Sequence, residues 1–184
     1  MHHIYTTQAF IIHSTPYGEA GKFLLLFTRD FGMIGAIAQG IRLNKSKLRY
    51  HIQDFSFSLI SLVRGKEVWR ITGANEIEKT VKLDLFHIKI FKLLHRLLQG
   101  EEKNEKLFEI INELYRSNIE KENNDIVELI VVLRILNCLG YIYNKDLSIF
   151  FDNHIIDEDT IGMADKLKKE IIKSINLALK ESQL

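Results

Sequence analysis

Four cations lie close together in a segment of the sequence that contains no acidic residue. No Asp or Glu occurs between positions 31 and 53. Cations without neighbouring acids suit a polyanion, because each Lys or Arg that neutralises a phosphate releases a counterion. We therefore predict that residues 40–49, named the basic loop from this point on, contact nucleic-acid phosphates. The residues predicted to make these contacts are Arg42, Lys45, Lys47 and Arg49.

Aromatic side chains near these cations indicate a second kind of contact. In grooves that hold single strands, cations follow the backbone while bases stack on aromatic rings. Base stacking is predicted for Tyr17, Phe31 and Tyr50. Weaker phosphate contacts are predicted for Lys22, Arg64, Lys66 and Arg70. The structural alternative is that the loop cations are an ordinary solvated surface and that the aromatic rings fill the ends of the domain.

The segments that position these residues have the pattern of β-strands. Over the first 75 residues, short β-branched or aromatic runs alternate with turns rich in Gly, Asn and Asp. Five such runs, with the basic loop after the third, predict a five-stranded OB-fold β-barrel over residues 1–76. A switch in apolar parity predicts a bulge near Leu59 and Ile60. An SH3-like barrel and a plain meander have the same composition and stay open as alternatives.

The remainder of the chain has a helical pattern. From about residue 76 the apolar period changes from two to three or four, and Gly100 and Gly140 follow predicted helix ends. The last apolar face, which includes Met163 and Leu167, predicts one long final helix. Amphipathic helices of this length are stabilised by packing on one another. The predicted fold class is therefore α+β, with an all-α helical bundle over residues 77–184.

Composition is that of a globular protein with an uneven charge distribution. Apolar residues make up 46% of the chain and charged residues 27%, with a net charge of +1. The first 75 residues hold nine Lys and Arg against four Asp and Glu. The predicted barrel is therefore basic, and the helical part is mildly acidic.

Enzymatic and metal-binding functions find no support in the sequence. The single cysteine, Cys138, excludes an intrachain disulfide and a cysteine-cluster metal site. No two histidines have the i, i+4 spacing of a zincin, and no Walker or dinucleotide-binding motif occurs. We therefore predict a non-enzymatic protein without a cofactor or a metal.

The sequence also predicts a cytoplasmic protein that does not enter a membrane. The N-terminus has no secretory-signal pattern. The longest apolar runs, residues 23–27 and 129–133, are far too short to cross a bilayer.

Several short motifs occur in a specific order. In the first half these are residues 9–19 (AFIIHSTPYGE), 26–32 (LFTRDFG), 38–42 (AQGIR) and 45–48 (KSKL). Their order and spacing closely resemble the N-terminal domain of RecO, a family of bacterial DNA repair proteins. Residues 133–141 (LRILNCLGY) are similar to the helix of that family that ends in Leu-Gly-Tyr.

The resemblance implies a function as well as a fold. It implies a recombination mediator that binds single- and double-stranded DNA, promotes annealing and assists RecA loading. The implied partners are RecR and single-stranded-DNA-binding protein, and the implied location is the bacterial nucleoid. The basic surface of the family corresponds to Arg42, Lys45 and Lys47, whereas Gln39 stands where a Lys is usual.

The chain departs from the family in its second half. Many relatives carry a four-cysteine zinc site after the Leu-Gly-Tyr segment, which this sequence lacks, and the helical domain is short. The chain therefore resembles a short, zinc-less member. Two alternatives stay open: a protein-protein adaptor with weak or no DNA binding, and an OB-fold protein that binds RNA.

Overall fold

The computed structural model describes residues 3–77, 85–116, 124–151 and 156–181. The chain divides into two compact units, Met1–Phe108 and Glu109–Leu184. The first unit contains helical residues as well as the barrel, and residues 78–84 lie outside the described ranges. The domain limit expected after residue 76 therefore stays a prediction. In the described ranges no helix has the length and apolarity needed to span a bilayer.

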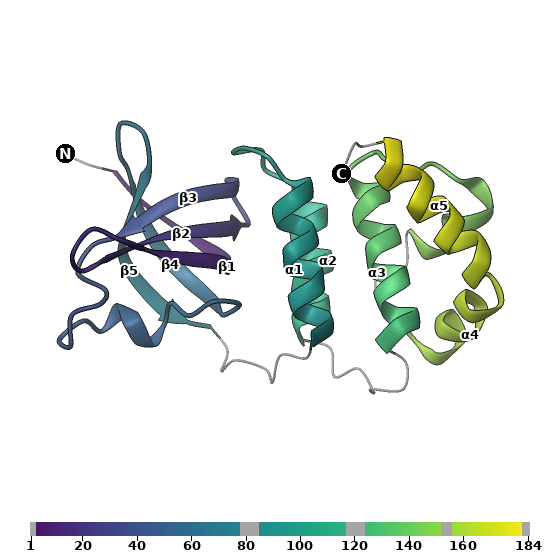
Figure 1. Cartoon of the computed structure of the whole chain (residues 1–184), viewed down its shortest axis with the longest axis horizontal. Helices are drawn as coiled ribbons and strands as arrows, with labels where there is room; N and C mark the ends of the chain where they lie inside the picture. Colours follow the sequence, from purple (N-terminus) through teal and green to yellow (C-terminus); the bar gives the residue numbers. More distant parts are fainter. Residues whose placement is uncertain (1–2, 78–84, 117–123, 152–155, 182–184) are drawn as a thin grey trace. The chain divides into compact units, whose positions relative to one another are not determined.

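Five strands of the first unit form a closed barrel (Figure 1). They are β1 (Ile4–Tyr17), β2 (Gly21–Thr28), β3 (Gly32–Ala38), β4 (Phe57–Arg64) and β5 (Trp69–Glu76). Their order around the barrel is β1-β2-β3-β5-β4, and β3 pairs with β5 in parallel. A meander would instead pair β3 with β4, so this order excludes it. The closed five-stranded barrel confirms the predicted OB-fold.

Strand β1 is 14 residues long and belongs to two strand pairs. Residues 4–10 pair with β4, and residues 9–17 pair with β2. The β1–β2 register shifts between Ile11 and His13, and such irregularities bend a strand between its two partners. The β4–β5 register shifts between Ser61 and Leu62, close to the bulge predicted near Leu59 and Ile60. The extra residue, Thr72, lies in β5, so the prediction that β4 itself is bulged is wrong.

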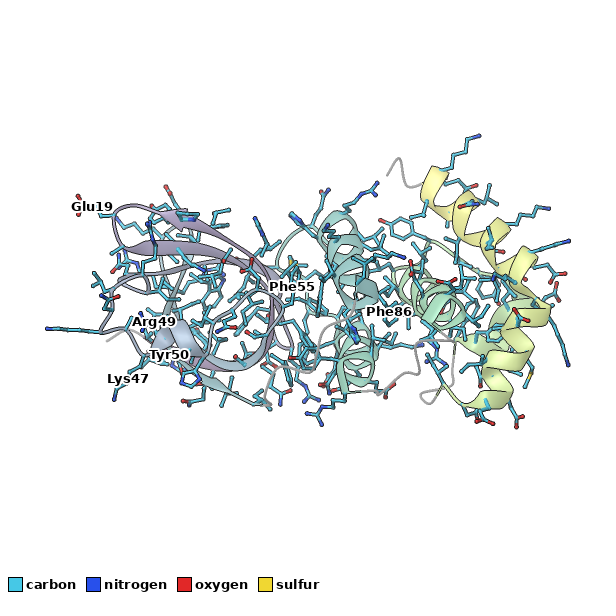
Figure 2. All side chains as sticks on the ribbon, turned by 60° about the horizontal axis from the view of Figure 1, so that its bottom comes forward. Glu19, Lys47, Arg49, Tyr50, Phe55 and Phe86 are labelled. Atoms are coloured by element: carbon cyan, nitrogen blue, oxygen red, sulfur yellow. The ribbon has the colours of Figure 1, made fainter. Side chains whose placement is uncertain are left out.

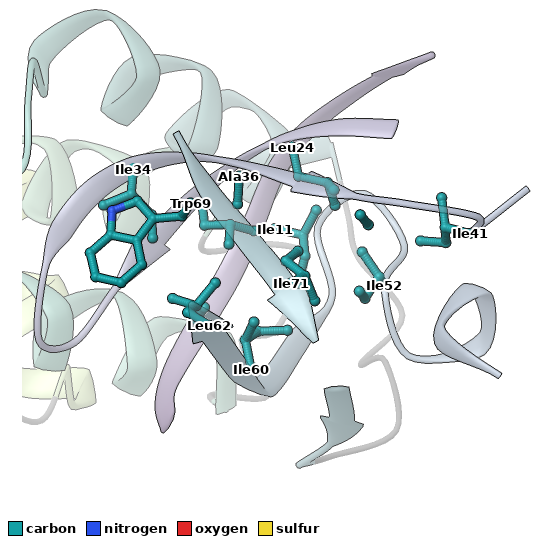
Figure 3. Close-up of a cluster of buried hydrophobic side chains, with 13 residues drawn as sticks. Ile11, Leu24, Ile34, Ala36, Ile41, Ile52, Ile60, Leu62, Trp69 and Ile71 are labelled. Atoms are coloured by element: carbon teal, nitrogen blue, oxygen red, sulfur yellow. The ribbon is translucent and has the colours of Figure 1, made fainter. Parts of the chain in front are cut away.

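The barrel interior is filled by aliphatic side chains and one indole. Trp69 lies at one end of this cluster and Ile41 at the other (Figure 3). Ile41 and Ile52 lie outside the strands, so the connection from β3 to β4 contributes to the core at both of its ends. The buried cluster consists of Ala9, Ile11, Leu24, Leu26, Ile34, Ala36, Ala38, Ile41, Ile52, Ile60, Leu62, Trp69 and Ile71.

An aromatic cluster covers the outer side of β1 and β4. The rings of Phe10 and Phe57 are stacked with centroids 4.4 Å apart. Phe91, from α1 (Leu85–Leu97), lies 5.7 Å from Phe10. Phe108, near the start of α2 (Glu105–Arg116), lies 5.4 Å from Phe10. Aromatic packing therefore joins these helical residues to the barrel within the first unit.

All the regular secondary structure described in the second unit is helical. Besides the end of α2, from Glu109 onward, four helices are described there. They are α3 (Asn124–Cys138), the 3₁₀ helix η3 (Lys145–Phe150), α4 (Glu158–Lys166) and α5 (Lys168–Glu181). Helix α3 packs against α4 and α5. Gly140 ends α3 with a φ of +80°, and the Tyr141 amide donates to the Leu136 carbonyl at 2.9 Å. The helical second half confirms the α+β fold class.

The prediction of one long final helix is wrong. Helix α4 ends at Lys166, and its cap residue Leu167 leaves helical geometry with a φ of −97° and a ψ of 11°. Helix α5 begins at the next residue. Met163, predicted to be apolar core, is 41% exposed, and the neighbouring Ala164 is buried instead. A period of four in the sequence does not reveal this break, because both helices keep their own apolar faces.

Candidate nucleic-acid interface

Contacts with the barrel hold both ends of the basic loop. Gly40 has a φ of +66°, a conformation that favours glycine, and it turns the chain away from β3. The next residue, Ile41, is buried in the barrel core. The Arg42 amide then donates to the Ala20 carbonyl at 2.9 Å. Beyond the loop, Ile52 is buried in the same core. The cations therefore lie on a segment of defined position.

The four cations of the basic loop are all exposed. In the described ranges, the side chains of Arg42, Lys45 and Lys47 make no hydrogen bond or ion pair. The Arg49 Nη2 donates to the Tyr50 hydroxyl at 2.6 Å, and the guanidinium lies over the same ring, 4.7 Å from its centroid. Figure 2 shows Lys47, Arg49 and Tyr50 on one short stretch of the surface. The positive charge of the four cations is therefore available to an anion.

A hollow of about 430 Å³, the loop hollow, brings together Lys22, Arg42 and Arg49. Lys22 is partly compensated there. Its Nζ donates to the Ser14 Oγ at 3.1 Å, and the Ser14 hydroxyl donates to the Asp54 carboxylate at 2.5 Å. Asp54 also lines the loop hollow. The uncompensated charge of the loop hollow therefore comes from the two arginines.

A larger hollow of about 680 Å³, the outer groove, crosses β3 between the β1–β2 turn and the β4–β5 turn. Four predicted residues line it, Tyr17 from one part of the sequence and Arg64, Lys66 and Arg70 from another. Gln39, the position where the resemblance implies a Lys, lines the same groove, and so does the acidic Glu67. The outer groove therefore lies where OB-folds bind oligonucleotides, which is over strands 2 and 3 and at the loops β1–β2 and β4–β5.

Arg64 differs from the other cations of the outer groove because it is paired. Its Nη1 donates to the Glu101 carboxylate, and its guanidinium lies 4.6 Å from the Trp69 ring centroid. The Trp69 indole also donates to Glu101, at 3.1 Å. Glu101 therefore competes with a phosphate for the charge of Arg64. In the described residues, the side chains of Lys66 and Arg70 make no hydrogen bond or ion pair.

The three predicted stacking residues differ in exposure. Tyr17 is 52% exposed and Tyr50 is 59% exposed. Phe31 is half-buried, with its ring centroid 5.6 Å from that of Tyr5 and 4.9 Å from that of Trp69. It helps to fill one end of the barrel. Base stacking on Phe31 stays a prediction, and these contacts do not favour it.

Phe23 of β2 is an exposed aromatic residue that the sequence prediction omitted. Its side chain is 36% exposed, and its strand neighbour Leu24 lies in the barrel core. Alternation along the run Lys22 to Thr28 contained the signal, since inward Leu24 and Leu26 place Phe23 on the outside.

Metal ligands do not gather in the described part of the chain. No group of three or more His, Cys, Asp or Glu side chains there could hold a metal ion. His87, which lies in α1, is buried, with 6% of its surface exposed. The absence of a cofactor stays a prediction.

Comparison with known sequences gives consistent matches. Residues 1–79 match the family described as recombination protein O N terminal. The DNA repair protein RecO of Dehalococcoides mccartyi is 31% identical over 115 residues, which cover 59% of this chain and 46% of the relative. The DNA repair protein RecO of Heliobacterium modesticaldum is 30% identical over 143 residues, or 75% of this chain and 52% of the relative.

A longer match extends into the helical unit. The DNA repair protein RecO of Clostridium perfringens is 29% identical over 185 aligned residues, which cover 91% of this chain and 74% of that protein. The chain spans about half the length of the Dehalococcoides and Heliobacterium relatives. The matched N-terminal region coincides with the barrel, and the matched relatives share one description. The chain therefore belongs to the RecO family.

Proposed function

We propose that this chain binds DNA through its barrel, with the phosphate backbone following the basic loop and the outer groove. The observation that carries this proposal is the gathering of exposed cations that have no acidic partner in the described residues. These cations are Arg42, Lys45, Lys47, Arg49, Lys66 and Arg70. They come from the β3–β4 connection, the β4–β5 turn and strand β5. The outer groove lies on the surface with which OB-folds bind oligonucleotides.

In this proposal the chain acts as a DNA repair and recombination mediator, not as an enzyme. It binds single- and double-stranded DNA and promotes annealing. Cations that neutralise phosphates lower the repulsion between two strands, which favours pairing. It also assists RecA loading together with RecR and single-stranded-DNA-binding protein, in the cytoplasm at the nucleoid. Similarity to proteins named DNA repair protein RecO supports this role.

Three features of the barrel surface favour the alternative of a protein-protein adaptor with weak or no DNA binding. Gln39 is neutral, Glu101 pairs with Arg64, and Asp54 partly compensates Lys22 through Ser14. Each of these features removes positive charge from the proposed DNA surface. A protein with these features and weak DNA affinity would act by binding other proteins.

A salt titration tests the proposal. The affinity for a fluorescent single-stranded oligonucleotide is measured between 50 and 200 mM salt. If all six unpaired cations contact phosphates, log affinity falls with log salt with a slope of about −4, or roughly 300-fold over this range. Replacing Lys45 and Lys47 together by Ala makes the slope shallower by about 1.4. The control replaces Lys169 and Lys173, two exposed residues of α5, by Ala.

The outcomes distinguish the candidates. Salt-dependent binding that weakens in the Lys45/Lys47 variant but not in the α5 control supports DNA binding. An absence of binding at 50 mM salt, with RecR binding retained, supports the adaptor. Displacement of the DNA by lower concentrations of RNA of the same sequence supports the RNA-binding alternative. Mixing complementary labelled strands then tests annealing.

A further inference from the structure

Outward-facing side chains form one row across four strands of the barrel. Phe23 of β2 is opposite Ile37 of β3, and Ile37 is opposite Arg70 of β5 in the parallel pair. Arg70 is in turn opposite Val63 of β4. Neighbours of these residues along the strands, such as Leu24, lie in the barrel core, so the row faces outward. Because Ile37, Val63 and Arg70 line the outer groove, Phe23 lies directly beside that groove.

The ring of Phe23 rests on a glycine of the next strand. A Cβ added to Gly35 would lie 2.7 Å from Cζ and 3.1 Å from Cε2 of Phe23, so any side chain there would force the ring to move. Gly35 therefore leaves the space that the ring occupies on the sheet surface. The ring is supported from below, yet 36% of the residue stays exposed. A ring held in this way loses little conformational entropy when a planar ligand stacks on it.

The charged and aromatic side chains near Phe23 indicate which kind of ligand could bind there. Arg70 lies two positions along the row and carries a charge with no described partner. Tyr17, which is 52% exposed, lines the same groove as Ile37. An aromatic platform next to unpaired cations suits a nucleotide, since a base stacks on the ring while its phosphate meets the cation.

We propose that Phe23 is a stacking platform for an unpaired nucleic-acid base and gives the barrel a preference for single strands. This inference rests on the proposed function and specifies which form of DNA the outer groove takes. A base within a duplex is already stacked on its neighbours and pairs with its partner, so it cannot lie on the ring. The phosphate contacts of the basic loop serve single and double strands alike.

The alternative for Phe23 is purely structural. Aromatic side chains that cover a glycine of a neighbouring strand stabilise β-sheets. Under this alternative, any large apolar side chain that covers Gly35 serves equally well. A substitution that keeps apolar cover but removes the aromatic face therefore separates the two roles.

The test compares Phe23→Leu and Phe23→Trp in the full chain, with fluorescent single-stranded and duplex DNA at one salt concentration. We expect Phe23→Leu to lower single-strand affinity about five- to 150-fold, the range of one base–aromatic stack, and to leave the salt slope unchanged. Its duplex affinity stays that of the wild type. Phe23→Trp retains single-strand affinity, and its added indole fluorescence is quenched by the oligonucleotide. Tyr143→Leu is the matched control, because Tyr143 is 87% exposed in the other unit.

Three results would overturn this inference. One is single-strand affinity of Phe23→Leu equal to that of the wild type. Another is an equal loss of single-strand and duplex affinity, accompanied by a lower melting temperature, which assigns Phe23 a structural role. The third is that DNA does not quench the added indole fluorescence of Phe23→Trp. In all three cases the wild type still binds with a steep salt dependence. Failure of the proposed function is different, because the wild type itself then shows no salt-dependent binding.

Discussion

Replacing Glu101 by Gln is expected to strengthen DNA binding, although it removes an ion pair. Glu101 accepts hydrogen bonds from both Arg64 and the Trp69 indole. A Gln side chain keeps an oxygen acceptor for the indole and loses the negative charge that holds Arg64. Arg64 lines the outer groove, so the substitution makes one further cation available to phosphate.

The size of the effect follows from exposure and from counterion release. The side chains of Arg64 and Glu101 are 55% and 41% exposed, and exposed pairs contribute about 0.2–1 kcal/mol. Removing the need to break this pair therefore raises affinity about 1.4- to 5-fold. One additional phosphate contact makes the salt slope steeper by about 0.7 for single strands. The gain then decreases roughly 2.6-fold between 50 and 200 mM salt.

Fluorescence anisotropy with a single-stranded oligonucleotide measures both quantities. The matched control is Glu102→Gln, which makes the same change in net charge at the next position, where the side chain is exposed. Equal gains in the two variants would mean that net charge alone is responsible. An affinity and a slope of Glu101→Gln identical to those of the wild type would refute the reasoning, because Arg64 would then serve only to hold the segment between α1 and α2 on the barrel.

Two further predictions concern stability. Gly32 has a φ of +67°, and a Cβ there would lie 2.1 Å from the Glu102 carbonyl oxygen; Gly32→Ala therefore lowers the free energy of unfolding in urea by more than about 2 kcal/mol. Gly18→Ala, with a φ of +59° and open space around it, costs only about 1 kcal/mol. Hydrogen bonds from the Thr160 hydroxyl and amide to Asp157 lower the pKa of this carboxyl group below its ordinary 3.8. The carboxylate therefore stabilises α4 above the unfolded-state pKa, and this contribution is lost as pH falls through the lowered folded-state pKa. Circular-dichroism melting should show a lower Tm for Asp157→Ala than for the wild type at pH 7, and a smaller difference between the two at pH 2.

Local pattern was sufficient for several features of the fold. Alternation and turn residues located five strands, and the change of period near residue 76 located the helical part. Gly40 and Gly140, both with positive φ, mark the chain reversals expected at those positions. The break at Leu167 was missed, since a break between two helices with separate apolar faces changes no local signal. The bulge was expected near Leu59 and Ile60 of β4, but its extra residue lies in the paired strand β5.

The proposed site required long-range pairing as well as sequence. The basic loop can be recognised in the sequence because its cations lie within eight residues and no acid separates them. The outer groove is not, because Tyr17 and Lys66 come together only through the barrel order. The pairing of cations with acidic residues is equally non-local, because 37 positions separate Arg64 from Glu101. Phe23 lies beside the outer groove because of the β2–β3 register, and its ring has room because Gly35 has no side chain.

The sequence by itself therefore determined the fold class, the family resemblance and the charge of the basic loop. These are properties of composition and of neighbours along the chain. The tertiary structure decided which predicted cations share a groove, which are already paired and which aromatic rings stay exposed. Those properties depend on strand register and on burial, which bring together residues that are distant in the sequence.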